Sequence, residues 1–472
     1  MRRSPTGRSD LVAADHVRAF DLALGAAVGL ARIPFLFAGY GTDSDAWRVA
    51  WTGREIARTG IYQSSRAPGN PVPEIAAAAL AFAPPWALNA MSAFLGAAAV
   101  AFFGVLLRRL GCRVWVAGAV ALAFTPVVAI HSADAMDYVW ALAFVLGAWL
   151  AVLDRRPGLA GLLIGFATGC RITSVVMLAP LSIVLAAGSG NAAHGRGRAL
   201  AVLWGTGLIA AAVAFAPVFV RSGLSFLHDY EHGYPRLIYV VKNCTVDVWG
   251  ILGCVALTWA VGRVLLAGGR PAADPALPSG PGAMIPAASV AVAIELVLFF
   301  RLPHDAGYLI PAVPFTLLLL ARALGRREFM ALCACLVLSS FLVKVSELDS
   351  PGSMPPGTPG ARFRVAGHPL QVDVLRGPLV TEQLRREAGL RYVAGVRVAA
   401  RRLPRPSLIA ADEWLPFLRV MAGGSHEGKA TYVYAVAPAE LDSLRRGGVA
   451  VYDLYGPEGR LRALGGDRRG AP

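Results

Sequence analysis

Residues 20–62 read FDLALGAAVGLARIPFLFAGYGTDSDAWRVAWTGREIARTGIY, an apolar run followed at once by a stretch of mixed charge. The run from Phe20 to Gly39 has about the 20 residues that a helix needs to cross a bilayer. Basic residues precede it and no small-residue cleavage site follows it, so we interpret it as a retained first transmembrane span. The basic residues are Arg2, Arg3, Arg8 and Arg18.

Further apolar runs follow, namely Trp86–Leu107, Val114–Ile130, Tyr138–Leu153, Ala199–Val220, Met284–Phe300 and Tyr308–Leu320. The chain of 472 residues is 56% hydrophobic and 16% charged, with a mean hydropathy of +0.54. These values exclude an ordinary soluble protein. Leu159–Ala187 counts as two short helices that meet at Gly169, Cys170 and Arg171. The sequence therefore predicts an α-helical polytopic membrane protein with about 11 spans.

The basic residues predict how the spans are oriented. If the N-terminus is cytoplasmic, every loop expected inside is short and carries arginine, as the positive-inside rule requires. The same rule explains the net charge of +15 without a nucleic-acid partner. The outer side then receives residues 40–85, 131–137, 221–247 and 301–306. The inner arginines are Arg108, Arg109, Arg113, Arg155, Arg156, Arg196, Arg198, Arg263, Arg270, Arg322, Arg326 and Arg327.

The hydrophobic pattern stops near Lys344, and a Pro/Gly-rich stretch follows. We therefore divide the chain into a transmembrane domain (1–345) whose outer loop 40–85 carries the candidate site, a linker (346–361) and an extracytoplasmic domain (362–472). Strand-like and helical patterns alternate in the last part and predict a small α/β domain. The strand-like stretches are Leu408–Ala411, Thr431–Val436 and Gly448–Leu454, and the helical ones are Glu413–Met421 and Pro438–Arg445.

A helix from about Asp45 to Thr59 is predicted directly after the first span, because cap-type residues open it and Gly60 closes it. One narrow stripe of this helix carries tryptophan and arginine, and a broad polar face lies opposite. That composition is typical of a helix in the headgroup layer, with the polar face free to line a cavity. For Asp43, capping of the helix is the simpler interpretation. The stripe contains Trp47, Trp51, Arg54 and Arg58.

After Tyr62 the sequence QSSRAPGNPVPE forces an extended, turning backbone that can hold Arg66 in place. The order of features resembles the GT-C superfamily of membrane glycosyltransferases, especially the branch of protein O-mannosyltransferases and the aminoarabinose transferases of lipid A modification. In that family an acid follows the first span, an interfacial helix ends at a glycine, and a proline-rich segment leads to the second span. Here the features are Asp45, Trp47–Thr59, Gly60 and Pro68–Pro73.

The resemblance implies a sugar donor with a polyprenyl-phosphate leaving group, an acceptor that enters from the outer side, and a first-loop acid as catalytic base. Attack of a hydroxyl on the anomeric carbon needs a carboxylate within hydrogen-bond reach. Asp45 is the first candidate and Asp43 the second. Many members carry an acidic pair, whereas here Asp45 is followed by Ala46 and Asp43 stands two residues before it, which leaves open which aspartate is the functional one. Arginine stabilises a departing phosphate well, and the outward candidates are Arg66, Arg171 and Arg301.

Other polar residues at span ends are expected to line the same cavity, namely His131, Asp137, His304 and Tyr308. Of these, the resemblance implies a site role for Tyr308 together with Arg301, because similar basic and tyrosine residues precede a late proline-containing helix in the family. Asp134 has the simpler interpretation of a helix cap. A lone arginine between two short apolar helices is costly unless it is paired or faces water, which favours a function for Arg171. Glu295, inside a span, is a functional candidate for the same reason.

The six cysteines show no metal-like spacing, so we expect no cofactor, and a divalent metal is not indicated although the sequence leaves a metal requirement open. The expected partners are a polyprenyl-phosphate-linked sugar, membrane lipids and a lipid, glycan or protein acceptor, without nucleic acid. We hypothesise an inverting glycosyltransferase of the inner (plasma) membrane, with a cytoplasmic N-terminus and an extracytoplasmic C-terminal domain. A flippase or transporter for a lipid-linked glycan is the alternative, and a nonenzymatic assembly subunit is a third hypothesis.

Overall fold

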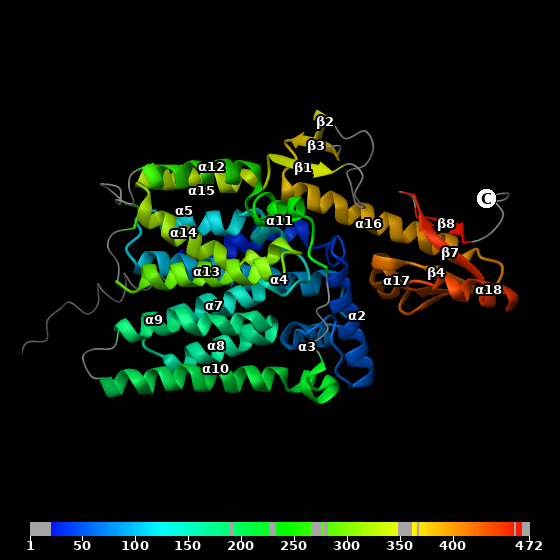
Figure 1. Cartoon of the computed structure of the whole chain (residues 1–472), viewed down its shortest axis with the longest axis horizontal. Coiled ribbons are helices and arrows are strands. Elements are labelled where there is room, and N and C mark those ends of the chain that lie inside the picture. The colour runs from blue at the N-terminus through cyan, green and yellow to red at the C-terminus, as the bar shows by residue number, and fades with distance from the viewer. Residues whose placement is uncertain are drawn as a thin grey trace, which may run out of the picture.

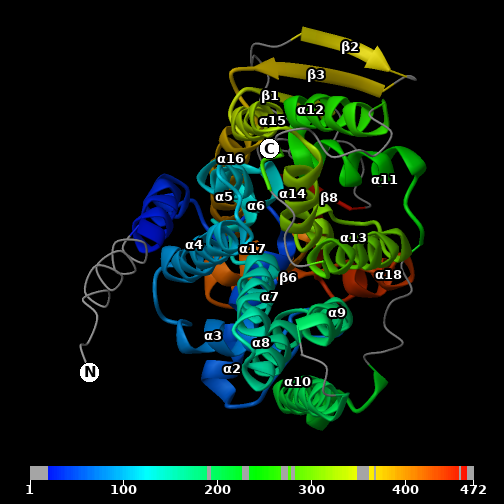
Figure 2. The ribbon, with the colours of Figure 1, turned by 90° about the vertical axis from the view of Figure 1, so that its left-hand side faces the viewer.

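The computed structural model describes residues 20–188, 193–225, 233–266, 275–277, 282–347, 361–365, 368–456 and 459–464. The larger part is a bundle of helices whose axes run side by side, and a smaller α/β part lies at one end of the bundle (Figure 1). Figure 2 views the same bundle along its helices, which appear end-on. The chain is therefore built from two parts of different composition.

The helices of the bundle follow the predicted spans, and residues 20–32 form the first of them. Helices α4, α10, α12 and α13 each contain a stretch long and apolar enough to cross a membrane alone. The predicted class, an α-helical polytopic membrane protein, is confirmed. The other described helices of this part are η1 (Ile33–Phe35), α2 (Ser44–Thr59), α3 (Pro71–Ala79), α4 (Pro85–Arg109), α5 (Trp115–Phe124), α6 (Pro126–His131), α7 (Tyr138–Leu153), α8 (Pro157–Cys170), η2 (Ile172–Met177), α9 (Leu178–Gly188), α10 (Ala193–Ser222), α11 (Leu237–Cys244), α12 (Val246–Leu266), α13 (Met284–Arg301), η4 (Ala306–Leu309), α14 (Ala312–Ala323) and α15 (Arg326–Ser339).

Two breaks in the helices lie among the residues that form the candidate site. The span predicted at Val114–Ile130 is divided into α5 and α6, because Pro126 has no N–H and Thr125 before it is extended. Arg171 is also extended, with φ −146° and ψ 118°, where α8 ends. The predicted junction of two short helices at this arginine is confirmed.

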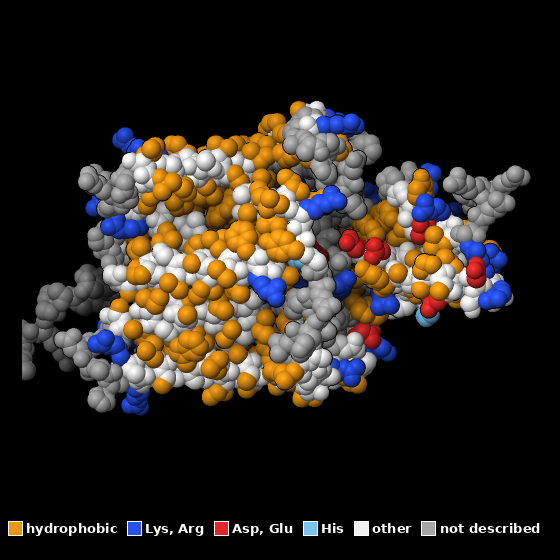
Figure 3. Space-filling model, viewed as in Figure 1, with side chains coloured by type: hydrophobic (Ala, Val, Ile, Leu, Met, Phe, Trp, Pro, Cys, Tyr) orange, Lys and Arg blue, Asp and Glu red, His pale blue; other side chains and the backbone are white. Residues whose placement is uncertain are grey.

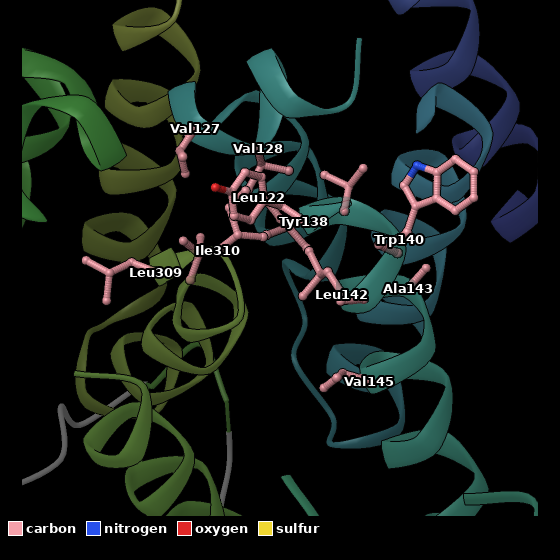
Figure 4. Packing of buried hydrophobic residues seen from close by; sticks show 14 of the residues in the cluster. Leu122, Val127, Val128, Tyr138, Trp140, Leu142, Ala143, Val145, Leu309 and Ile310 are labelled. Atoms are coloured by element: carbon pink, nitrogen blue, oxygen red, sulfur yellow. The ribbon is translucent and has the colours of Figure 1, made fainter. Parts of the chain in front are cut away.

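Apolar side chains from several helices form one core beneath these breaks. Figure 4 shows Tyr138 of α7 beside Val128 of α6, with Ile310 from the segment after η4 nearby. On the far side of α7, the Trp140 indole N–H donates to Ser92 Oγ of α4 at 2.8 Å. The core thus fixes α7, whose first turn carries residues of the candidate site.

The outer surface of the bundle is apolar, as Figure 3 shows on one face. Several large side chains are 65–69% exposed there, namely Phe94, Ile209, Val213, Val255 and Val297. Such a surface suits lipid rather than water. Lys and Arg side chains gather at the end of the bundle away from the α/β part (Figure 3). This distribution fits the predicted orientation, which stays a prediction.

The C-terminal part contains two sheets. The first is antiparallel, with the order β1-β3-β2, and the second has the order β5-β6-β4-β7-β8, in which β4 is parallel to both β6 and β7. The predicted small α/β domain is confirmed. Its elements are β1 (Val343–Glu347), β2 (Ala361–Val365), β3 (His368–Val374), α16 (Pro378–Arg401), β4 (Ser407–Ala410), η5 (Asp412–Trp414), α17 (Leu415–Ala422), β5 (His426–Glu427), β6 (Ala430–Val433), α18 (Pro438–Arg446), β7 (Ala450–Tyr455) and β8 (Arg460–Ala463).

The domain boundaries given above stay predictions. Strand β1 crosses the start of the proposed linker and pairs with β3, with Val345 opposite Val372. The central linker residues, 348–360, lie outside the described residues. The sequence does not predict α16, a helix of 24 residues that runs from the first sheet toward the second (Figure 1).

Candidate active site

Helix α2 begins directly after the first span and carries both candidate acids. Gly39 has φ +70°, and a Cβ there would lie 2.6 Å from the Trp47 ring, so the turn into α2 requires glycine. The Asp43 side chain caps the helix by accepting the backbone N–H of Asp45 at 2.8 Å. Gly60, with φ 69°, ends it in the left-handed conformation. The predicted helix is confirmed at both ends.

Most of the tryptophan and arginine stripe of α2 contacts protein, whereas Arg58 is exposed. Trp47 is 2% exposed and stacks on Phe417 of α17, with ring centroids 4.5 Å apart. Arg54 Nη1 donates to the backbone oxygen of Val420 at 2.6 Å. The prediction that this stripe lies in the headgroup layer is therefore wrong for Trp47 and Arg54. Indole and guanidinium groups suit any surface that is partly apolar and partly polar. Here the C-terminal domain provides such a surface in place of the lipid headgroups.

An ion-pair network links four of the predicted residues. Arg66 Nη1 lies 3.4 Å from Asp45 Oδ2, and its Nη2 donates to Asp137 Oδ1. Arg171 Nη1 donates to the other oxygen of Asp137 at 2.9 Å. The Asp137 side chain is fully buried, whereas those of Arg66 and Arg171 are 16% and 15% exposed. One buried carboxylate thus holds two guanidinium groups close together near the protein surface.

Aromatic rings complete the surroundings of Arg171. Its guanidinium carbon lies 4.2 Å from the ring centroid of Tyr138 and 4.7 Å from that of Tyr308. The Tyr138 hydroxyl donates to Asp305, which also accepts the Gly307 N–H at 2.8 Å. A Cβ at Gly307 would lie 2.6 Å from the Tyr138 ring, so only glycine fits beneath it. The segment after α13 therefore closes one side of the network.

His131 borders the same network. Its ring centroid lies 4.6 Å from that of Tyr138, and its Nδ1 lies 2.9 Å from Asp134 Oδ2. Asp134 Oδ1 accepts the Met136 N–H at 3.2 Å, so this acid shapes the loop between α6 and α7. That loop delivers Asp137 to the two arginines.

Asp43 is open to solvent, yet protein atoms surround it closely. This partial desolvation, together with the nearby carboxylates of Asp45 and Asp305, raises the pKa of Asp43 to about 7. A carboxyl group of this kind exchanges a proton near neutral pH, as a general base must. The position of Asp43 as helix cap and its altered pKa are compatible, because the cap uses only one carboxylate oxygen.

The loop that carries Arg66 is held by a group that the sequence did not reveal. Glu74 is fully buried and accepts the Ser65 N–H at 2.7 Å and the Ser65 hydroxyl at 2.6 Å. The Tyr62 hydroxyl donates to the same carboxylate. The sequence signal that could have identified Glu74 is an acid within an apolar stretch that follows prolines. Such an acid is costly to bury unless other groups donate hydrogen bonds to it.

Two predicted residues lie apart from the network. Arg301, the last residue of α13, is exposed, and no described ion pair joins it to Asp45 or Asp137. His304 is also exposed, and its backbone oxygen accepts the side-chain amide of Asn243 at 3.0 Å. Glu295 is 4% exposed inside α13, and its carboxyl group interacts electrostatically with Arg171.

The chemistry available is carboxylate and guanidinium chemistry. Asp43 and Asp45 offer oxygens for a proton, and Arg66 with Arg171 offers N–H donors to an anion. Within the described ranges, no group of three or more His, Cys, Asp or Glu side chains has a geometry that could hold a metal ion. Any negative charge that develops here meets arginine.

Comparison with known proteins identifies the fold. No protein-family model and no curated protein sequence matches the chain. The crystal structure of ArnT from Cupriavidus metallidurans bound to undecaprenyl phosphate superposes with a TM-score of 0.55 at 14% identity, covering 93% of each chain. The apo structure of the same protein gives 0.45 at 13% identity, covering 94% of this chain and 93% of that one. The chain therefore has a GT-C-like membrane fold similar to that of ArnT, as the order of its motifs predicts.

Proposed function

We propose that this protein transfers a sugar from a polyprenyl-phosphate carrier to an acceptor hydroxyl on the extracytoplasmic side of the inner membrane, with inversion at the anomeric carbon. The observation that carries the proposal is the network in which Asp137 holds Arg66 and Arg171 together while Arg66 also reaches Asp45. It combines an anion-binding group with a carboxylate at the outer end of a membrane bundle. The structural neighbour ArnT was crystallised with undecaprenyl phosphate.

The two arginines are proposed to hold the phosphate of the donor. Each guanidinium has five N–H donors, and Asp137 occupies only part of them. Because Asp137 fixes both groups, little reorganisation is needed when negative charge develops on the leaving phosphate. Tyr138 and Tyr308 keep Arg171 in place from the sides.

The reaction that fits these groups is a single displacement. The acceptor oxygen attacks the anomeric carbon and forms the new C–O bond while the bond from that carbon to the phosphate oxygen breaks. The leaving polyprenyl phosphate keeps the electron pair, and its charge is stabilised by Arg66 and Arg171. The acceptor proton passes to a carboxylate of α2.

Asp45 and Asp43 together are proposed as the base. Asp45 is 27% exposed and stands beside Arg66, where the acceptor would meet the donor. Asp43, two residues earlier, has its pKa raised to about 7 by partial desolvation and by the carboxylates of Asp45 and Asp305, and can take up the proton at neutral pH.

The proposal is tested with purified protein and a synthetic short-chain polyprenyl-phosphate sugar. We expect Asp45→Asn to lower kcat by at least about 100-fold, because general-base assistance contributes that much. Asp154→Asn is the matched control, since Asp154 pairs with Arg109 in an exposed bridge at the opposite end of α7 from Asp137. Full turnover by both Asp45→Asn and Asp43→Asn would overturn the base assignment.

The alternative of a carrier makes a different prediction. A flippase moves labelled lipid-linked glycan across vesicles and forms no covalent product. We expect product formation without net transport, and the reverse result would reject the transferase.

A further inference from the structure

A hollow lies where the C-terminal domain meets the start of α2. Its walls include Thr42 and Ser44 from the membrane part, Arg385 from α16, and Glu413, Trp414 and Phe417 from the segment η5–α17. It is open on one side and contains ≈ 550 Å³ counted out to its mouth.

The aromatic wall of the hollow is rigid. The Trp414 ring packs against Tyr392, with centroids 4.5 Å apart, and against Phe417 at 5.0 Å. Phe417 in turn stacks on the buried Trp47. Trp414 is half-buried, so part of its surface faces the hollow.

Polar groups stand around this wall. Glu413 is exposed at one edge and Ser44 lies at another. Arg385 is half-buried, and its Nε–H is buried without a hydrogen-bond partner in the part of the chain that the structure describes. The side chain of Arg385 also lines the hollow, where a guanidinium can donate N–H groups to a ligand oxygen.

We propose that this hollow binds a sugar ring of the acceptor, an inference that rests on the proposed function and narrows its acceptor to a glycan. A sugar ring has C–H faces that pack on an aromatic surface and hydroxyl edges that exchange hydrogen bonds with a carboxylate, a guanidinium and a hydroxyl. The hollow offers this combination. Ser44 stands between Asp43 and Asp45 in the chain, so a sugar in the hollow lies beside the proposed base.

The test measures binding apart from transfer. Saturation-transfer NMR is recorded on the full-length protein in detergent with methyl β-D-glucopyranoside and methyl α-D-mannopyranoside as probes, and with N-acetyl-serine-N-methylamide for a protein acceptor. We expect saturation of the sugar C–H protons and none of the serine probe. Binding of the serine probe alone would overturn the proposal.

Variants locate the binding in the hollow. Trp414→Ala is expected to weaken sugar binding by about tenfold, while Trp414→Phe retains most of it because the ring remains. Glu413→Gln, an exposed change that leaves the packing intact, is expected to weaken binding several-fold. Trp259→Phe, on the outer surface of α12, is the control. Unaltered binding in both Trp414→Ala and Glu413→Gln would reject the site.

Release of polyprenyl phosphate from the synthetic donor is followed in the same preparations. Wild-type protein that binds sugars but never cleaves the donor would contradict the proposed function and leave the sugar site standing. Donor cleavage with no sugar binding would contradict only the site.

Discussion

At the scale of single residues, Asp137 has the largest expected effect. It is the buried carboxylate that pairs with both Arg66 and Arg171. Asp137→Asn leaves Arg171 without its carboxylate partner and Arg66 with only the 3.4 Å contact to Asp45, so we expect a loss of about 3 kcal/mol in the free energy of unfolding. Activity should fall together with it. Thermal unfolding in detergent measures the first effect, and an unchanged melting temperature would contradict it.

The pH dependence of turnover reports on Asp43. Partial desolvation and the carboxylates of Asp45 and Asp305 raise its pKa to about 7. A base must be deprotonated to act, so kcat/KM is expected to rise as the pH increases through about 7 and to level off above it. Asp43→Asn should remove this rise. Profiles between about pH 5.5 and 8.5 measure it, and the same rise in the variant would exclude Asp43.

Tyr308 is expected to act through its ring and not its hydroxyl. The ring lies 4.7 Å from the guanidinium of Arg171. Tyr308→Phe keeps the cation–π contact, whereas Tyr308→Leu loses it, so we expect the donor KM to increase about fivefold only in the leucine variant. Steady-state kinetics with the synthetic donor measure this, and equal effects of both changes would contradict it.

At the scale of elements, α16 fastens the C-terminal domain to the candidate site. Arg386, which is 3% exposed, donates to the backbone oxygens of Ala133 at 2.7 Å and Phe35 at 3.1 Å. Glu382 accepts the Thr42 hydroxyl at 2.6 Å. Although burial raises the pKa of Glu382, Arg386 and neighbouring cations lower it overall, so it is charged. One helix thus holds segments from both sides of the site.

Loss of this fastening should loosen the loop between α6 and α7. We expect Arg386→Ala to lower kcat and to speed amide hydrogen exchange at residues 132–137, because two backbone oxygens lose their donor. Arg391→Ala, an exposed change on the same helix, is the control. Unchanged exchange with full activity would show that α16 only links the two sheets.

Some elements could be predicted from the sequence and others could not, for physical reasons. Helix α2 carries its own signals, a capping acid and the terminal Gly60, so local sequence defines its ends. Its stripe shows that the two faces differ, but not that Phe417 rather than lipid covers Trp47. Helix α16 carries seven charged residues among its 24, and the backbone oxygens that accept from its buried Arg386 are distant in sequence.

The candidate site divides in the same way. Asp45, Asp137 and Arg171 can be identified as candidates from the sequence, because charged groups at the ends of membrane spans are energetically costly unless they are paired or functional. Glu74 and Glu382 hold neighbouring segments in place, and only the tertiary structure reveals their partners.

At the scale of the whole molecule, the orientation in the membrane is the prediction to test. The basic turn between α7 and α8 is expected inside and the C-terminal domain outside. Alkaline phosphatase fused after Leu464 should be active in cells, whereas a fusion at Arg155 should be inactive. The opposite pattern would place the candidate site on the cytoplasmic side and reject the proposed function.

Arg66 stands between two carboxylates, Asp137 in the interior and Asp45 at the edge. When a phosphate anion binds this guanidinium, it competes with Asp45 for the same N–H groups, and the longer 3.4 Å contact is the weaker of the two. Asp45 then loses a counter-ion at the moment when a hydroxyl must give up its proton. Under the proposed function, the empty site keeps its acid neutralised, and the arrival of the donor itself prepares the attack.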